Sequence, residues 1–184
     1  MGKNILILNG SPRARGNTAL LIRAFAEGAQ AAGHEVTCFD LQKMDLHPCL
    51  GCCKGGRDVN SPCVQKDDMH KIYPVYREAD VVVLASPMYY WAFSAQLKMA
   101  FDRLFAVAEC NPGYANPKKD CCLIMAAEGN TPDNWKPVLD YYHSLMHFME
   151  WTDRGAVLAG GVFEAGAVAG QPVLEEARAL GASL

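Results

Sequence analysis

The sequence predicts an α/β fold in which a parallel β-sheet carries helices on both faces. Segments typical of strands and of helices alternate along the 184 residues, and this alternation is characteristic of βαβ units. Two of the strand segments are unbroken apolar runs, as expected for strands buried on both faces. Polar loops follow the strands, so we expect a binding site at the edge of the sheet where the strands end.

Each predicted strand is a short segment rich in apolar, β-branched or aromatic residues. The first run stops at Asn9, where a cluster of turn residues begins. Pro87 ends the third strand, because proline has no N–H group to donate to a sheet. In chain order, the predicted strands are residues 5–8, 34–40, 81–85, 121–126 and 156–159.

Each predicted helix repeats apolar residues every three or four positions, which gives the helix one apolar face. Gly33 is expected to end the first helix, since glycine is common directly after helices. Ser94 can cap the third helix with its hydroxyl group. In chain order, the predicted helices are residues 18–32, a short helix capped by Asp67 or Asp68 that runs through 72–78, and residues 94–105, 133–150 and 172–180.

Composition limits the classes of function. The formal net charge of −3 and a pI near 5.9 give no basic surface for nucleic acid. No apolar run approaches the length that spans a membrane. We expect a single domain over residues 1–184 in the cytoplasm, where the eight cysteines are thiols or ligands rather than disulfides.

The loop after the first strand is predicted to bind an anion. It leads directly into the N-terminus of a helix, where unpaired N–H groups and the helix dipole favour negative charge. Ser11, Asn17 and Thr18 add neutral donors, and Arg13 and Arg15 can add charged ones. The glycine patterns of triphosphate-binding and dinucleotide-binding loops are absent. The loop therefore suits one terminal phosphate, and an ordinary capped βα loop is the alternative.

Two further loops are predicted at the same edge. Residues 86–93 place three consecutive aromatic residues, Tyr89, Tyr90 and Trp91, at the end of the third strand, and these cannot all face the core. Residues 127–132 form a polar loop after the fourth strand. A ligand with a phosphate at one end and a flat ring at the other would satisfy these loops. Riboflavin monophosphate (FMN) fits this description best.

Three motifs occur in order along the chain. They are Gly-Ser-Pro-Arg with Gly-Asn-Thr in residues 10–18, Ser-Pro-Met-Tyr-Tyr-Trp in residues 86–91, and Leu-Lys with Asp-Arg in residues 97–103. Together they resemble the flavodoxin-fold NAD(P)H-dependent FMN reductase family, nearest its iron–sulfur flavoprotein branch. The resemblance runs from residue 3 to about residue 133. It implies a flavodoxin-like three-layer sandwich with five parallel strands in the order 2-1-3-4-5.

The resemblance also implies a cofactor and its binding residues. FMN would be the cofactor, NAD(P)H a substrate, and no side chain need act as a catalyst. Family members are commonly dimers or tetramers, so we expect a homodimer or homotetramer. The expected FMN-binding residues, all in the three loops, are Ser11, Arg13, Gly16, Asn17, Thr18, Pro87, Met88, Tyr89, Tyr90, Trp91, Glu128 and Gly129.

The resulting hypothesis is an oxidoreductase that passes electrons from NAD(P)H through FMN to a small acceptor. Free flavin, a quinone, a nitroaromatic or an iron–sulfur centre could be that acceptor. One alternative is an electron carrier of the iron–sulfur flavoprotein type that works with ferredoxin. The alternative of another class is a regulatory protein that binds flavin without catalysis.

Residues 41–66 show no regular period and resemble the cysteine-rich insertion of the family. A long segment of this kind inside a domain is usually functional. The cluster-bearing branch uses a C-x₂-C-x₂-C pattern with a fourth cysteine. This sequence departs from it, because residue 55 is glycine and two of the cysteines are adjacent. The candidate metal ligands are Cys49, Cys52, Cys53 and Cys63.

Four interpretations of these cysteines stay open. They could hold an iron–sulfur cluster, or a zinc ion with His47 as a further ligand. Cys49 and Cys52 could also form a redox-active C-x-x-C pair. The preferred interpretation is that all four are free thiols packed as small hydrophobic groups.

Overall fold

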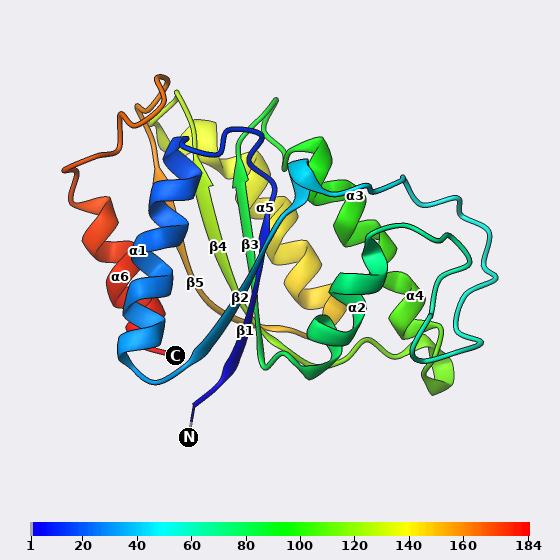
Figure 1. Cartoon of the computed structure of the whole chain (residues 1–184). Coiled ribbons are helices and arrows are strands. Elements are labelled where there is room, and N and C mark those ends of the chain that lie inside the picture. The colour runs from blue at the N-terminus through cyan, green and yellow to red at the C-terminus, as the bar shows by residue number, and fades with distance from the viewer. Residues whose placement is uncertain (1) are drawn as a thin grey trace.

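The computed structural model describes residues 2–184. Its five strands form one sheet in the order β2-β1-β3-β4-β5, and every neighbouring pair is parallel (Figure 1). This confirms the predicted α/β class and the strand order of a flavodoxin-like fold. The strands are β1 (Asn4–Asn9), β2 (Glu35–Asp40), β3 (Val81–Pro87), β4 (Asp120–Ala126) and β5 (Thr152–Ala159).

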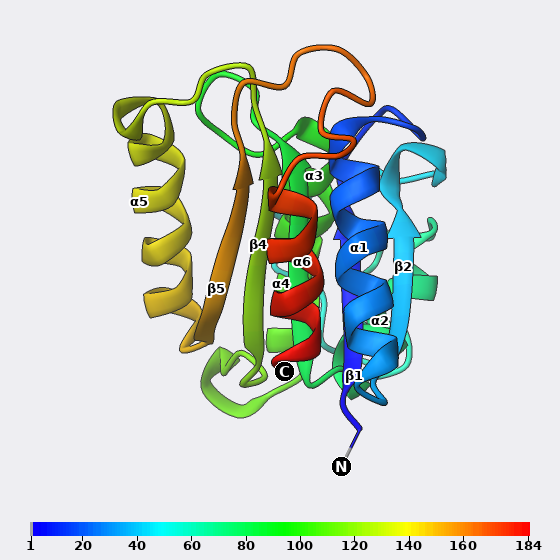
Figure 2. The same cartoon turned by 90° about the vertical axis from the view of Figure 1, so that its left-hand side faces the viewer.

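The helices are α1 (Asn17–Ala31), α2 (Met69–Glu78), α3 (Ala95–Arg103), α4 (Phe105–Ala108), α5 (Pro132–Met149) and α6 (Val173–Ala182), with the short 3₁₀ turns η1 (Leu41–Lys43) and η2 (Pro112–Tyr114). α1 and α6 cover one face of the sheet, and α2, α3 and α5 cover the other (Figures 1 and 2). Within residues 2–184, no helix combines the length and the apolar character needed to cross a membrane.

The core lies on both sides of the sheet, because successive residues of a strand point to opposite faces. In β1, Leu6 and Leu8 belong to the apolar cluster beneath α2, α3 and α5. Ile5 and Ile7 belong to the cluster that contains Phe25 of α1. Both faces of β1 are thus covered, which explains why its sequence is a continuous apolar run.

Several element boundaries differ from the prediction by one to four residues, and two of these differences have a clear physical reason. β5 begins at Thr152, four positions before the predicted start at residue 156. The sequence did not indicate this part of the strand, because its first residues are polar and exposed. Arg154 pairs with Asp120 of β4 at 3.0 Å (Nε to Oδ2), so this part of the strand is held by charge as well as by the sheet. The predicted helix 94–105 ends at Arg103, where a tighter turn at Leu104 leads into α4.

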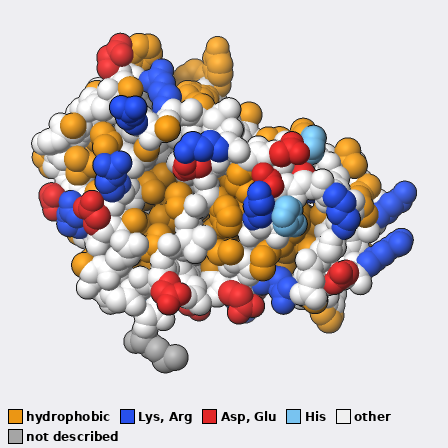
Figure 3. Space-filling view, in the orientation of Figure 1, with side chains coloured by type: hydrophobic (Ala, Val, Ile, Leu, Met, Phe, Trp, Pro, Cys, Tyr) orange, Lys and Arg blue, Asp and Glu red, His pale blue; other side chains and the backbone are white. Residues whose placement is uncertain are grey.

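The cysteine segment, residues 41–66, extends from the side of the molecule beside α3 and α4 (Figure 1). Apart from η1 it contains neither helix nor strand. Lys and Arg side chains project from this side in the space-filling view (Figure 3). The segment therefore lies outside the three layers and must be held in place by side-chain contacts.

Candidate functional site

A cavity of about 190 Å³ lies at the edge where the parallel strands end, the usual position of a ligand site in such sheets. Loops after β1, β3, β4 and β5 form its walls. The predicted residues that line it are Ser11, Arg13, Gly16, Asn17, Thr18, Pro87, Met88, Tyr89 and Glu128. The lining residues that the sequence interpretation missed are Ala126, Ala127, Val162 and Phe163.

The first wall is the uncapped N-terminus of α1. Gly16 is the N-cap residue, and it supplies no side-chain cap to the first turn. The first N–H groups of a helix have no partner within the helix, so those of α1 are available to a ligand. Thr18 lines the cavity at the same place and is 2% exposed. Free N–H groups, a hydroxyl and the helix dipole together suit a phosphate group.

Arg13 adds positive charge at the edge of this wall. Its Nη1 donates a hydrogen bond to the carbonyl oxygen of Phe163 at 3.1 Å. A guanidinium has several N–H donors, so this bond leaves others for an anion. The backbone N–H of Arg13 donates to Ser11 Oγ at 3.3 Å, which folds the loop back toward α1. The loop geometry thus keeps Ser11 and Arg13 beside the helix N-terminus.

The side chain of Asn17 makes its contacts inside the protein. Its Nδ2 donates to the carbonyl oxygens of Val162 at 3.3 Å and Glu164 at 2.9 Å. Its Oδ1 accepts from the N–H of Val168 at 3.2 Å. The amide of Asn17 therefore fastens the loop after β5 to α1.

The second wall, after β3, is a tight two-residue turn. Tyr89 and Ala92 exchange two backbone hydrogen bonds of 3.1 Å, and Tyr90 and Trp91 between them have φ of +48° and +59°. These features define a type I′ turn, which non-glycine residues adopt at an energetic cost. Tyr89 lines the cavity, whereas Tyr90 is 95% and Trp91 53% exposed and both lie outside the lining.

The third wall, after β4, joins the loop after β5. The carbonyl oxygens of Ala127 and Glu128 accept hydrogen bonds of 3.0 Å from the N–H groups of Val162 and Gly161. The Glu128 side chain is exposed at the cavity. Gly129 packs against Asn134, whose side chain would lie within 2.5 Å of an added Cβ atom. Gly129 thus shapes the loop behind the cavity without lining it.

The four cysteines of the segment line a second cavity of about 80 Å³, between the segment and the helices α3 and α4. Cys49, Cys52 and Cys53 are exposed and Cys63 is half-buried, and every cysteine in the chain is a free thiol. In residues 2–184, no three His, Cys, Asp or Glu side chains gather closely enough to hold a metal ion. The thiols are the right donors for a cluster, but this arrangement is not a preformed metal site.

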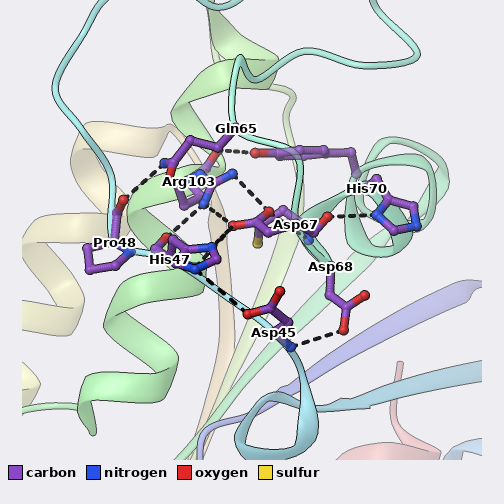
Figure 4. A network of polar contacts seen from close by, with 10 residues as sticks. Asp45, His47, Pro48, Gln65, Asp67, Asp68, His70 and Arg103 are labelled. Atoms are coloured by element: carbon purple, nitrogen blue, oxygen red, sulfur yellow. Dashed lines mark hydrogen bonds and ion pairs between the residues drawn. The ribbon is translucent and has the colours of Figure 1, made fainter.

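A buried ion pair between Arg103 and Asp67 lies where the two ends of the cysteine segment meet (Figure 4). Arg103 Nη1 lies 2.6 Å from Asp67 Oδ2, and Nη2 lies 3.0 Å from Oδ1. Nη1 also donates to the carbonyl oxygen of His47 at 2.7 Å, and the His47 N–H donates to Asp67 Oδ2 at 3.0 Å. Because His47 and Asp67 flank the cysteines in sequence, Arg103 of α3 holds both ends of the segment.

Opposing effects act on Asp67. Burial raises the pKa of its carboxyl group. Hydrogen bonds from Arg103 and from the N–H groups of His47 and Met69 lower this pKa, and together they outweigh the effect of burial. The net pKa is below the ordinary value, so Asp67 is charged at neutral pH and balances Arg103.

One donor of Arg103 is unused. Its Nε is buried and has no hydrogen-bond partner within residues 2–184, and Arg103 lines the cysteine cavity. A buried N–H without an acceptor costs about 1–3 kcal/mol. Arg103 thus carries an unsatisfied donor and also lines the cysteine cavity.

Comparison with known proteins identifies the family. The family described as NADPH-dependent FMN reductase matches residues 3–132. The chain belongs to this family. Membership confirms the resemblance carried by the three loop motifs. The matched range contains the walls after β1, β3 and β4.

Relatives of known type support the same assignment. An iron–sulfur flavoprotein of Methanocaldococcus jannaschii is 37% identical over 99 residues, which cover 54% of this chain and 50% of the relative. Another, of Methanosarcina thermophila, is 28% identical over 169 residues, or 92% and 83% of the two chains. The chain spans about half the length of the first curated relatives it matches. These relatives confirm the predicted nearness to the iron–sulfur flavoprotein branch.

Solved structures agree with the fold. An NAD(P)H:quinone oxidoreductase from Methanothermobacter marburgensis has a TM-score of 0.77 and 20% identity, and the alignment covers 100% of this chain and 97% of the other. At this identity the likeness concerns the fold. It confirms the flavodoxin-like architecture of this member of the FMN reductase family.

Proposed function

We propose that the protein passes electrons from NAD(P)H through bound FMN to a small flat acceptor, such as a quinone, free flavin or a nitroaromatic. The observation that carries this proposal is one cavity that combines an uncapped helix N-terminus and Arg13 with the aromatic ring of Tyr89. Bound FMN supplies the hydride and electron transfer, whereas the protein supplies placement and electrostatics.

The hydrogen-bond donors of the cavity indicate where the phosphate end and the ring end of the ligand would lie. The first turn of α1, the hydroxyl groups of Ser11 and Thr18, and Arg13 would hold the phosphate, because all are donors or positive. Glu128 is on the loop after β4 and disfavours an anion near it. Met88 and Tyr89 are then left to contact the ring. These roles follow from charge and hydrogen-bonding capacity, and the fit to a phosphate ester with a flat ring is good.

The cavity volume bears on access to the ring. At about 190 Å³ it is smaller than the roughly 300–1,000 Å³ of typical small-molecule sites. A bound flavin would therefore project from it, with one face of the ring open. An open face is what NAD(P)H and an acceptor need to reach the flavin in turn, and ping-pong kinetics are the expected consequence.

The test compares FMN with riboflavin, which lacks the phosphate. Apoprotein should bind FMN at one per chain and riboflavin at least about tenfold more weakly, because hydrogen bonds to a charged group are worth about 1.5–3 kcal/mol each. Consumption of NADH or NADPH under air, with and without added FMN, separates the enzyme from a binding protein. Equal affinity for the two flavins would refute the phosphate site.

We also propose a homodimer or homotetramer in the cytoplasm. The exposed rings of Tyr90 and Trp91 stand beside the cavity, and the space-filling view shows a hydrophobic projection at the end that carries the loop after β3 (Figure 3). Exposed apolar patches commonly mark interfaces. Free thiols throughout support a reducing compartment. A fully active monomer in sedimentation at micromolar concentration would contradict the oligomer.

The second candidate is an electron carrier that holds an iron–sulfur cluster and works with ferredoxin. It is favoured by the four thiols that line one cavity together with Arg103, and by the iron–sulfur flavoprotein relatives. Metal binding often orders its own ligands. Anaerobic purification with assays of iron, zinc and sulfide distinguishes the cases. Iron with sulfide supports the carrier, zinc alone supports a zinc site, and neither supports free thiols.

A further inference from the structure

The loop after β5, residues 160–171, is anchored to the other walls of the cavity. Its Gly161 and Val162 N–H groups donate to the backbone of the loop after β4. The amide of Asn17 makes three hydrogen bonds to it, and Arg13 makes one to the Phe163 carbonyl oxygen. Val162 and Val168 are buried at 4% and 0% exposure. The loop is thus a fixed wall, built by contacts with two neighbouring loops.

Phe163 is displayed on this fixed wall. Its side chain is 62% exposed, although its neighbour Val162 is buried, and it lines the same cavity as the donors of α1. Because the backbone that carries this ring is already anchored, binding has to restrict only the side-chain torsions of Phe163. Such a ring can stack on a flat ligand at low entropic cost.

Tyr89 approaches the cavity from the other side. It follows β3, whereas Phe163 follows β5, and β4 lies between these strands in the sheet. Two strand spacings of about 4.8 Å separate β3 and β5 by roughly 10 Å. The segments after both strands rise at the same end of the sheet, in green and in orange (Figures 1 and 2). Flat rings therefore fit between the two aromatic walls.

We propose that Phe163 is the second aromatic wall of the acceptor slot and favours flat aromatic acceptors over compact ones. The inference rests on the proposed function. Phe163 contacts the acceptor by stacking, and Asn17 is a positioning residue that fixes the loop and thereby the ring. The slot would have Met88 and Tyr89 on the flavin side and Phe163 on the acceptor side.

The test measures reoxidation of the reduced flavin. FMN in the protein is reduced without oxygen and then mixed with menadione, a flat quinone, or with ferricyanide, a compact ion. Phe163→Ala should lower the second-order rate with menadione about tenfold, equivalent to about 1.4 kcal/mol of lost stacking. The rate with ferricyanide should change less than about twofold. Equal losses with both acceptors, or no loss with menadione, would overturn the proposal.

Phe148→Ala is the matched control. Phe148 lies on α5, is 74% exposed and does not line the cavity. Its replacement removes a similar exposed ring and should leave both rates unchanged. A selective loss with menadione in this variant would show that exposed rings act nonspecifically and would also overturn the proposal.

Asn17→Ala tests the positioning role. Because Asn17 also lines the FMN cavity, both rates are measured at saturating FMN, and the readout is the ratio of the menadione rate to the ferricyanide rate. Asn17→Ala alone should lower this ratio, and it should lower it no further when Phe163→Ala is already present, because both changes remove one contact. Additive selective losses would contradict the role of Asn17. Reduction is performed both with NAD(P)H and with light in the presence of EDTA, which is oxidised as the flavin is reduced. Failure of NAD(P)H alone refutes the proposed function, while the light-reduced protein still tests Phe163.

Discussion

The two cavities of this chain are held by different kinds of contact. Hydrogen bonds connect the walls of the cavity at the sheet edge at many points. Ser94 is an example: its Oγ donates to the Gly10 carbonyl oxygen at 2.7 Å, and its N–H donates to Ser86 Oγ at 2.8 Å. The cysteine cavity depends on a segment that lies outside the layers and is closed at its base by Arg103 and Asp67. The sheet positions the first cavity, whereas the second depends on contacts of an irregular segment, with one buried ion pair between its two ends.

The difference predicts how each region responds to change. A site held by many neutral hydrogen bonds loses about 1 kcal/mol when one is removed, so its shape should survive single substitutions. A segment closed by a buried charge pair should respond to the loss of one partner with a large change in stability. Substitutions in the two regions should therefore differ in how much stability or affinity they cost.

The largest effect is expected for Asp67→Ala. The side chains of Asp67 and Arg103 are 0% and 1% exposed, so removal of the carboxylate leaves a buried, unpaired guanidinium. Breaking such a pair typically costs about 3–5 kcal/mol. Urea unfolding should show this loss in the free energy of unfolding, and proteolysis should cut first within residues 41–66.

Two further variants identify the cause. Asp68→Ala removes a neighbouring carboxylate that is 21% exposed and pairs with Lys71 at the surface, and it should cost less than about 1 kcal/mol. The double variant Asp67→Leu with Arg103→Met removes both charges and should recover most of the lost stability. A double variant as unstable as Asp67→Ala would show that packing, rather than the unpaired charge, causes the loss.

The next effect concerns Arg13 in the sheet-edge cavity. Arg13→Ala should weaken FMN binding by about 1.5–3 kcal/mol, the usual value of a hydrogen bond to a charged group, with little change in the free energy of unfolding. Titration of apoprotein with FMN measures it. Arg15 does not line the cavity, so Arg15→Ala should have a much smaller effect. A larger loss for Arg15→Ala would reassign the phosphate ligand without removing the site.

Low pH should weaken the ion pair between Asp67 and Arg103 and thereby lower the free energy of unfolding. The pKa of Asp67 is lowered in the folded protein from 3.8, so the unfolded chain takes up its proton at the higher pH. The stabilisation is fully present above the unfolded value and is lost as pH falls through the folded pKa. Wild type should lose stability in this range more steeply than the Asp67→Leu, Arg103→Met variant, by up to about 1.4 kcal/mol per pH unit. Parallel urea titrations would show equal slopes if the pair contributes nothing.

Much of the sheet-edge site could be predicted from sequence because its signals are local. The apolar run before Asn9 predicts a buried strand, and the loop and helix that follow predict the anion wall. The role of the Asn17 amide could not be predicted, because its partners Val162, Glu164 and Val168 lie at least 145 residues away in the chain. Phe163 was missed for the same reason, since a loop of glycine and alanine carries no pattern that places it beside α1.

For the cysteine segment, the sequence shows the candidate ligands but not the contacts that hold them in place. Its thiols and their spacing are visible in the sequence, and the structure brings Cys49, Cys52, Cys53 and Cys63 to one cavity. What holds them there is Arg103, which lies 36 residues from Asp67. The early polar part of β5 was likewise unpredicted, because Arg154 and its neighbours are exposed and pair with another strand. Long-range charge pairs leave no periodic signal.

The smallest expected effect is a gain in stability at the turn after β3. Tyr90 and Trp91 both have positive φ, which costs an L-residue with a Cβ atom about 1–2 kcal/mol. Asparagine and glycine are the residues that type I′ turns favour, so Tyr90→Asn with Trp91→Gly should raise the free energy of unfolding by about 1 kcal/mol. Tyr90→Ala with Trp91→Ala is the control, because alanine also disfavours positive φ and should give no such gain. If both double variants lose oligomerisation while only the Asn-Gly turn gains stability, the strain is accepted in order to display two aromatic rings at an interface. An Asn-Gly variant no more stable than wild type would show that the turn after β3 carries no backbone strain.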